Sequence, residues 1–174
     1  MIAIGDKGPS FTLPDTTGTD VAFPDGGGAT VVVFTCNHCP YALAWHDRLL
    51  TVARDYEERG VRTLLVNPND ADRYPRDSLE AMRERVLREG PWPVPYLRDE
   101  SQEVARAYDA KTTPDVFVFD SDGVLRYRGA PDADHMDEDQ NAAWLRGALD
   151  ALLDGRDVTE PETKPVGCSV KWKQ

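Results

Sequence analysis

The stretch VVVFTCNHCPY, residues 31–41, decides the fold of this chain. Its apolar run is typical of a strand buried on both faces, and it ends in two cysteines separated by two residues. A proline follows Cys39, and apolar residues then recur at spacings of three and four, which predicts a helix from about Pro40 to Arg59. The two thiols therefore lie at a strand-to-helix turn, close enough to form a disulfide.

The position of the pair predicts different roles for its two sulfurs. The start of a helix carries partial positive charge, which lowers the pKa of a cysteine placed there. We expect Cys36 to be the exposed nucleophilic thiolate and Cys39, inside the first turn, to be the shielded thiol that resolves a mixed disulfide. Between them, His38 can carry positive charge near neutral pH, and with polar Asn37 it is predicted to favour the thiolate.

A lone CxxC is also half of a structural zinc site, which needs four ligands. The chain has no second CxxC and no HxxxH, and outside the pair it offers only Cys168, His38, His46 and His135. We therefore prefer redox chemistry to metal binding, and we expect no metal and no other cofactor.

Composition limits the classes of partner. The chain has 174 residues and a net charge of −11, which argues against nucleic acid or an anionic membrane. No apolar run is long enough to span a bilayer, and the start does not resemble a secretory signal, so we expect a cytoplasmic protein, where a CxxC is more often catalytic than structural. We expect one domain over residues 1–174, with residues 156–174 as an irregular tail. The oligomeric state is left open.

The remaining patterns predict an α/β fold. A small hairpin is expected within residues 4–28, and strands at 30–35 and 61–66 are expected to form a right-handed parallel crossover around the first helix. A second helix is predicted from Asp77 or Ser78 to Gly90, with Glu80 placed for a capping box. An antiparallel hairpin turns at Asp122-Gly123, and a last helix spans 141–153.

This order of elements, with CxxCP at a strand end and a Thr-Pro before the late hairpin, resembles the thioredoxin fold. The resemblance implies a three-layer sandwich in which helices flank a central mixed sheet, extended here by the N-terminal hairpin. More narrowly, CNHCPY at 36–41, Thr113-Pro114 and the terminal GCSVKWK at 167–173 resemble a peroxiredoxin-like and thioredoxin-like group of the redoxin family. It implies that the Thr113–Pro114 bond is cis and lies beside the cysteines, and that both residues bind substrate, with the backbone before the proline pairing with it.

The chain also departs from its relatives. Peroxiredoxins share a PxxxTxxC pattern; if Cys39 stands at the peroxide-attacking position, Val32 and Cys36 replace the proline and the threonine. Thr113-Pro114 replaces the arginine that polarises the peroxide in that family. The buried aspartate that assists proton transfer in thioredoxins is replaced by Thr30, so Cys39 lacks its usual base.

We therefore expect an enzyme, a thiol-disulfide oxidoreductase that exchanges electrons through Cys36 and Cys39 between protein disulfides and a thiol reductant. Two alternatives stay open: a peroxiredoxin-like peroxidase that reduces hydroperoxides, and a non-catalytic module that binds metal or serves as a scaffold. Two interpretations also stay open for Cys168. The sequence favours an idle tail cysteine, and the other is an auxiliary resolving thiol brought to the CxxC by a tail anchored at Trp172.

Overall fold

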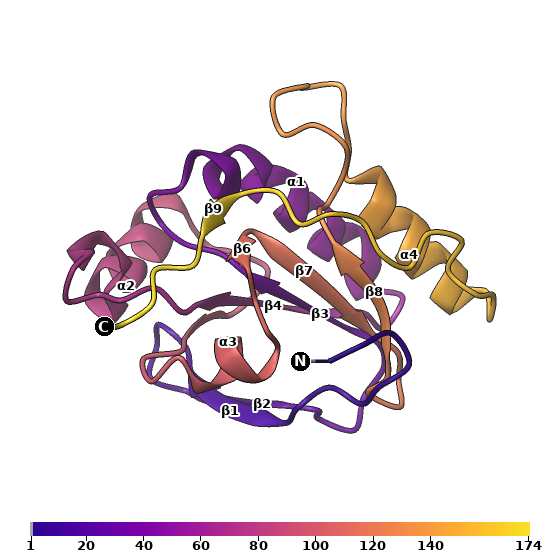
Figure 1. Cartoon of the computed structure of the whole chain (residues 1–174), viewed down its shortest axis with the longest axis horizontal. Coiled ribbons are helices and arrows are strands. Elements are labelled where there is room, and N and C mark those ends of the chain that lie inside the picture. The colour runs from indigo at the N-terminus through magenta and orange to yellow at the C-terminus, as the bar shows by residue number, and fades with distance from the viewer. Residues whose placement is uncertain (1) are drawn as a thin grey trace.

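The structure, a computed structural model, describes residues 2–174 and is built on a five-stranded mixed sheet in the order β5-β4-β3-β7-β8 (Figure 1). Parallel pairing joins β3 to β4 and β4 to β5, and antiparallel pairing joins β3 to β7 and β7 to β8. The predicted parallel crossover and late hairpin are therefore confirmed. The strand bounds are β3 Thr30–Phe34, β4 Arg62–Asn67, β5 Tyr96–Arg98, β7 Asp115–Phe119 and β8 Leu125–Gly129.

Different elements cover the two faces of this sheet (Figure 1). On one face, Val31 and Val33 of β3 pack in a core with residues of α1 (Pro40–Glu57), α2 (Leu79–Glu89) and α4 (Ala143–Leu153). The alternation of a strand sends Val32 and Phe34 to the other face. The elements that cover it are α3 (Glu103–Ala107) and the predicted N-terminal hairpin of β1 (Phe11–Pro14) and β2 (Asp20–Phe23).

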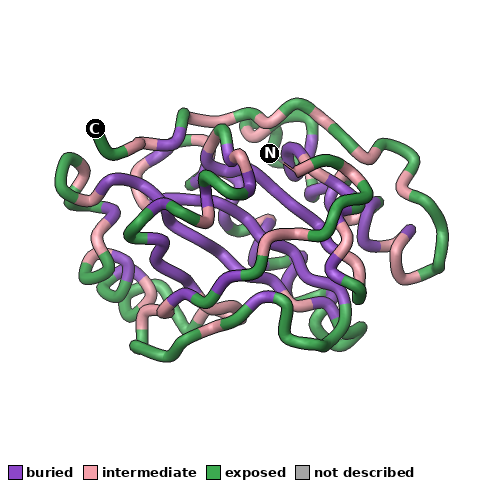
Figure 2. Tube along the Cα trace, turned by 60° about the horizontal axis from the view of Figure 1, so that its bottom comes forward, coloured by how far each residue is buried: buried purple, intermediate pink, exposed green. Residues whose placement is uncertain are grey.

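The central strands are buried along nearly their whole length, whereas the connecting loops carry most of the exposed residues (Figure 2). Val31, Val32, Val33 and Phe34 all have an exposed fraction of 0%. The continuous apolar run therefore marks a strand covered on both faces, as the sequence predicts.

The second helix begins as expected but is capped differently. Ser78 is the N-cap of α2, and its hydroxyl accepts a hydrogen bond from the backbone N–H of Ala81 (3.1 Å). Glu80 does not complete a capping box, because with Ser78 as the N-cap the required third helical position is Ala81; the Glu80 carboxylate pairs instead with Arg83 (2.7 Å). Asp77 ends a short 3₁₀ helix, Pro75–Asp77, and is fully buried.

The C-terminal tail is more ordered than expected. It runs from α4 back across the molecule to the region of β6 (Thr112–Thr113) (Figure 1). There a two-residue strand, β9 (Cys168–Ser169), pairs antiparallel with β6, so the tail is irregular, as predicted, except at this short strand. Among the helices of residues 2–174, none is both long and apolar enough for a membrane span.

Candidate active site at the cysteine cluster

The CxxC loop connects the end of β3 to the start of α1. The N-cap of α1 is Cys39, and Pro40 is the first helical residue. Cys36 therefore lies three residues before the cap, outside the helix. Each cysteine has an exposed fraction of 1%, so the prediction that Cys36 is the more exposed sulfur is wrong.

Thr113 contacts both sulfurs. Its hydroxyl oxygen Oγ1 lies 3.4 Å from Cys36 Sγ, and in the thiol form Cys39 Sγ donates to its carbonyl oxygen at 3.2 Å. The Thr113–Pro114 peptide bond is cis, the isomer that the resemblance implies. The edge of β6 that was predicted to pair with substrate is instead paired with β9, in a register that places Thr113 opposite Cys168.

The pKa values of the two sulfurs are shifted in the opposite sense to the prediction. The pKa of Cys39 is lowered, because its thiolate accepts hydrogen bonds from the Cys36 thiol, from the Cys168 thiol, and from the backbone N–H groups of Ala42 and Cys168. The pKa of Cys36 is raised, first because its thiol donates to Cys39 and then because it is buried. Cys39, and not Cys36, also holds the cap position of α1, where the backbone N–H of Ala42 faces its sulfur.

Asn37 anchors the loop and does not contact either sulfur through its side chain. Its backbone N–H donates to Asp77 Oδ1 (2.7 Å), and its side-chain oxygen accepts from Arg85 Nη1 (2.9 Å) and Tyr96 Oη (2.7 Å). Its side-chain nitrogen donates to the carbonyl of Arg76 (2.7 Å). Asn37 thus fixes the position of the loop, and the thiolate-tuning role predicted for it stays a prediction.

His38 points toward Asp77, a residue that the sequence did not place in the site. His38 Nδ1 lies 2.6 Å from Asp77 Oδ2, and the His38 ring stacks on Tyr74 with the planes 5° apart. Polar atoms of Cys36, His38 and Asp77 all lie within 4.8 Å of one another. His38 lowers the pKa of Cys36 through its backbone N–H, whereas the negative charge of Asp77 raises it.

Asp77 is itself held by two asparagines at the end of β4: Asn67 is the last residue of the strand, and Asn69 follows it. Asn67 Nδ2 donates to Asp77 Oδ1 and Asn69 Nδ2 donates to Asp77 Oδ2, each at 3.1 Å. The only signal available in the sequence was topological: polar residues that follow neighbouring parallel strands gather at one edge of the sheet. The sequence pattern instead indicates Asp77, together with Ser78, as a candidate start of the second helix.

The group formed by Cys36, His38 and Asp77 offers three donor atoms to a metal ion. Tetrahedral zinc requires a fourth ligand or a water, and Asp77 already accepts hydrogen bonds on both oxygens. A metal ion here would also occupy the Cys36 sulfur and prevent its redox chemistry.

Cys168 joins the pair as a third sulfur. It is half-buried and packs against the cluster of Cys36, Cys39 and Ala42. Burial raises its pKa, and so does the hydrogen bond that its thiol donates to Cys39. Cys168 is therefore in contact with the CxxC, as one of the two interpretations of the sequence requires.

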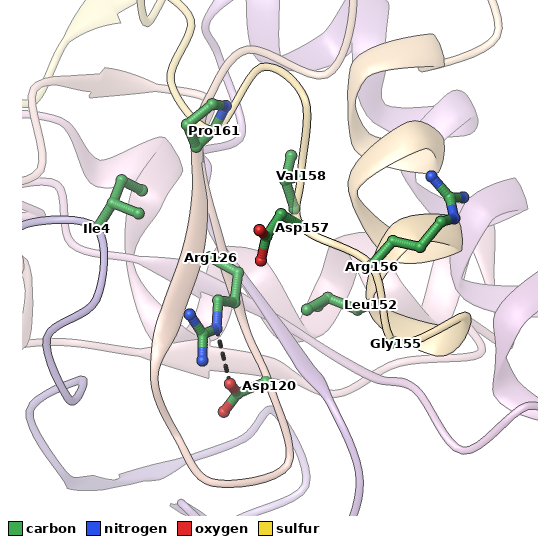
Figure 3. Close-up of a pocket in the computed structure, with 9 residues that line it drawn as sticks. All are labelled: Ile4, Asp120, Arg126, Leu152, Gly155, Arg156, Asp157, Val158 and Pro161. Atoms are coloured by element: carbon green, nitrogen blue, oxygen red, sulfur yellow. Dashed lines mark hydrogen bonds and ion pairs between the residues drawn. The ribbon is translucent and has the colours of Figure 1, made fainter.

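A pocket elsewhere lies between the late hairpin and the segment after α4 (Figure 3). Arg126 Nε donates to Asp120 Oδ2 there at 2.8 Å, which satisfies the charge of both side chains. None of the residues that line it is a cysteine, a histidine or a serine, so it holds no thiol for redox chemistry. We therefore place the functional site at the cysteine cluster.

Comparison with known proteins gives the family. An uncharacterized conserved protein from Geobacillus kaustophilus is 42% identical, with a TM-score of 0.93 over 99% of this chain and 94% of that one. A hypothetical protein from Sinorhizobium meliloti 1021 is 35% identical, with a TM-score of 0.92 over 99% and 96%. A secreted disulfide oxidoreductase from Mycobacterium tuberculosis is 19% identical, with a TM-score of 0.63 over 82% and 96%, and supports the thioredoxin-like fold alone.

A search of the curated proteins found no match. The model of the AhpC/TSA family, in contrast, matches residues 4–128. That match spans well over half of the sequence and includes the CxxC, the Thr113–Pro114 bond and all five strands of the central sheet except the end of β8. The chain belongs to the AhpC/TSA family.

Proposed function

We propose that the protein is a thiol-disulfide oxidoreductase that exchanges electrons between protein disulfides and a thiol reductant through Cys36 and Cys39. The observation that carries the proposal is that the two sulfurs pack in one buried cluster against a single residue, with Thr113 Oγ1 3.4 Å from Cys36 Sγ and the Thr113 carbonyl oxygen 3.2 Å from Cys39 Sγ. A thiolate and a thiol held in contact are the reactants that disulfide exchange requires. The lowered pKa of Cys39 supplies the thiolate near neutral pH.

In the reducing direction, a thiolate of the protein attacks one sulfur of the substrate disulfide and releases the other as a thiolate. A second sulfur of the protein then attacks the mixed disulfide, and a second substrate thiolate leaves. Two electrons pass to the substrate, and a Cys36–Cys39 disulfide forms. An external dithiol restores the pair by the reverse exchange.

Closing that disulfide requires Cys36 to lose its proton, and burial makes this loss costly. A ring nitrogen of His38 lies within 4.8 Å of Cys36 Sγ, and Asp77 lies 2.6 Å from its Nδ1, so His38 is the group to which we assign this proton. A thiol, an imidazole and an orienting carboxylate form the arrangement that activates many cysteines. We propose that this histidine replaces the buried aspartate whose position is taken by Thr30.

One observation favours peroxidase activity as a second candidate. The sulfur with the lowered pKa is Cys39, which stands where the resemblance places the peroxide-attacking cysteine. Against it, Cys36 replaces the threonine, and within residues 2–174 no arginine side chain is among the groups that hydrogen-bond to Cys39. Rapid cleavage of a peroxide needs groups that stabilise the leaving oxygen.

The test compares two substrates under the same conditions. The reduced protein is mixed in a stopped-flow instrument either with a fluorescent peptide disulfide or with hydrogen peroxide, and the Cys36→Ser, Cys39→Ser double variant is the control. We expect exchange with the peptide far above the control and peroxide consumption close to it. Rapid peroxide turnover without peptide exchange would replace the proposal with the peroxidase. Stoichiometric zinc in the purified protein, with neither activity, would support a binding module.

A further inference from the structure

The CxxC pair is inaccessible to a large substrate in this conformation. Cys36 and Cys39 each expose 1% of their surface, and disulfide exchange requires direct contact between the attacking and attacked sulfurs. Thr113 covers both sulfurs, and it is fully buried itself. A protein disulfide therefore cannot reach either sulfur of the pair without another group giving way.

The backbone edge beside the pair is covered as well. The register of β6 and β9 sets Thr113 opposite Cys168, so the tail occupies the place at which a substrate strand would pair. Gly167 lies so close to Thr113 that a Cβ atom there would collide with the Thr113 carbonyl. This close approach brings the next residue, Cys168, against Cys39.

The tail is held firmly after this point. Lys171 donates from its backbone N–H to Asn69 Oδ1 (2.9 Å), and its carbonyl accepts from the backbone N–H of Asp70 (2.8 Å) and from Gln102 Nε2 (2.9 Å). Val170 is buried, with 3% of its surface exposed. These anchors resist displacement of β9. A substrate therefore contacts the tail more readily than it displaces it.

Cys168 is the sulfur that a partner can meet. It is half-buried, whereas the other two cysteines are buried, and it packs against the cluster that contains Cys36 and Cys39. We propose that Cys168 is the outer thiol of a three-sulfur relay, through which electrons pass between an external protein disulfide and the CxxC in the order Cys168, Cys39, Cys36. The proposal rests on the proposed function and adds the residue that touches the substrate.

The steps balance from a state with thiols at Cys36 and Cys168 and a thiolate at Cys39. The Cys168 proton first passes to Cys39. The Cys168 thiolate then attacks the substrate disulfide and releases a first substrate thiolate. This thiolate takes the proton from Cys39. Cys39 then attacks Cys168 and releases the second substrate sulfur as a thiolate. Cys36 finally gives its proton to His38 and attacks Cys39. Cys168 leaves as a thiolate and takes that proton, which restores its thiol.

Overall, the substrate gains two electrons and one proton, and the single negative charge moves from Cys39 to the substrate. The Cys36–Cys39 disulfide holds the oxidising equivalents, and a dithiol reductant returns the protein to its starting state by the same path. Cys39 is thus the sulfur shared by two alternative disulfides.

The first test asks which sulfurs can bond. Cys36→Ser and Cys39→Ser each leave two cysteines, so they are matched controls for one another. Each reduced variant is treated with glutathione disulfide, alkylated, digested with trypsin and mapped by mass spectrometry. We expect an intramolecular Cys39–Cys168 disulfide in most molecules of Cys36→Ser and at least tenfold less Cys36–Cys168 disulfide in Cys39→Ser. Two free thiols in Cys36→Ser, or equal cross-linking in both variants, would overturn the relay.

The second test asks whether exchange needs Cys168. We expect Cys168→Ser to react at least tenfold more slowly with a peptide disulfide, while Ser169→Ala, the neighbouring position in β9, reacts at the wild-type rate. Gly167→Ala keeps all three sulfurs but separates β9 from Thr113, and it should slow the reaction at least threefold. An unchanged rate in both Cys168→Ser and Gly167→Ala would overturn the relay and leave the proposed function standing. If the wild-type protein fails to exchange at all, both proposals fall.

Discussion

Two different kinds of contact hold the CxxC loop. On the side of Asn37 and His38, the loop is bound by a buried polar network centred on Asp77. On the side of Thr113, the sulfurs meet one hydroxyl, one carbonyl and the Cys168 thiol. The polar side has its donors and acceptors committed to the loop, so we infer that it fixes the geometry. On the side of Thr113 and the tail, the contacts involve the sulfurs themselves, and we infer that this side carries the chemistry.

Cys39→Ser should have the largest effect, because Cys39 belongs to both proposed disulfides. We expect exchange with a peptide disulfide to fall about 100-fold or more, to the background of exposed thiols. In contrast, Cys36→Ser keeps Cys39 and Cys168 and should still complete one exchange per molecule. Counting the thiols lost per protein after a single addition of peptide disulfide checks this: two for Cys36→Ser and at most one, a Cys168 held in a mixed disulfide, for Cys39→Ser. Equal counts would remove the shared role of Cys39.

Asp77→Ala should disrupt the polar network and lower the stability of the folded protein. The carboxylate is fully buried and accepts from the backbone of Asn37 and from the side chains of Asn67 and Asn69. Removing it leaves these buried donors without a partner, which should cost about 3 kcal/mol of the free energy of unfolding. Urea titration of both proteins measures the difference.

The matched control for this prediction is Asp72→Ala. Asp72 is an exposed aspartate in the same loop, and we expect a change within about 0.5 kcal/mol. If Asp77→Ala were no less stable than Asp72→Ala, the polar network would not be what fixes the loop.

His46→Phe tests how much of the stability lost at acid pH comes from His46, which lies near Arg85 of the polar side. Burial and then the positive charge of Arg85 lower the pKa of His46 to about 3, from 6.5 in an unfolded chain. Between those values the unfolded chain binds more protons, so the folded state loses stability as the pH falls from 6.5 toward 3. Phenylalanine can keep the packing of His46 on Trp92 (4.5 Å between ring centroids) and cannot titrate.

We therefore expect the stability loss between pH 7 and pH 4 to be about 3 kcal/mol smaller in His46→Phe than in the wild type. Urea titrations at both pH values measure it, and His135→Phe, at a half-buried histidine on Tyr41, is the control. The same acid loss in His46→Phe and in the wild type would mean that another group controls it.

The fold could be predicted from local patterns, but the site only in part. The apolar run before Cys36 identified the central strand, and CxxCP with Thr113-Pro114 located the cysteines and the residue that contacts them. These features depend on residues close together in the sequence, or on a resemblance that covers most of the chain.

The rest depended on small shifts and distant contacts. The helix start near Pro40 was predicted correctly, but Cys36 was expected to be the cysteine at the helix start, whereas the cap residue is Cys39, three residues later. Asp77 lies forty residues from Asn37, and Cys168 reaches Thr113 only through a two-residue strand. No periodicity in the sequence encodes either contact, since each depends on how loops meet at one edge of the sheet.

Trp172→Ala should have the smallest effect and acts on the tail alone. Arg106 stands over the Trp172 ring, with its guanidinium carbon 4.5 Å from the ring centroid, and this contact fixes the chain just beyond the anchored Lys171. Losing it should cost about 1 kcal/mol, because the ring is half-buried and the cation stays in water.

A weaker anchor lets β9 open more often, which exposes Cys168 before it exposes the buried pair. We expect iodoacetamide to alkylate Cys168 about threefold faster in Trp172→Ala, with unchanged rates at Cys36 and Cys39. Lys164→Ala, at an exposed position of the same tail, should leave all three rates as they are. If all three cysteines reacted faster together, the tail and the CxxC loop would open as one unit, and the contrast between the two sides would not hold.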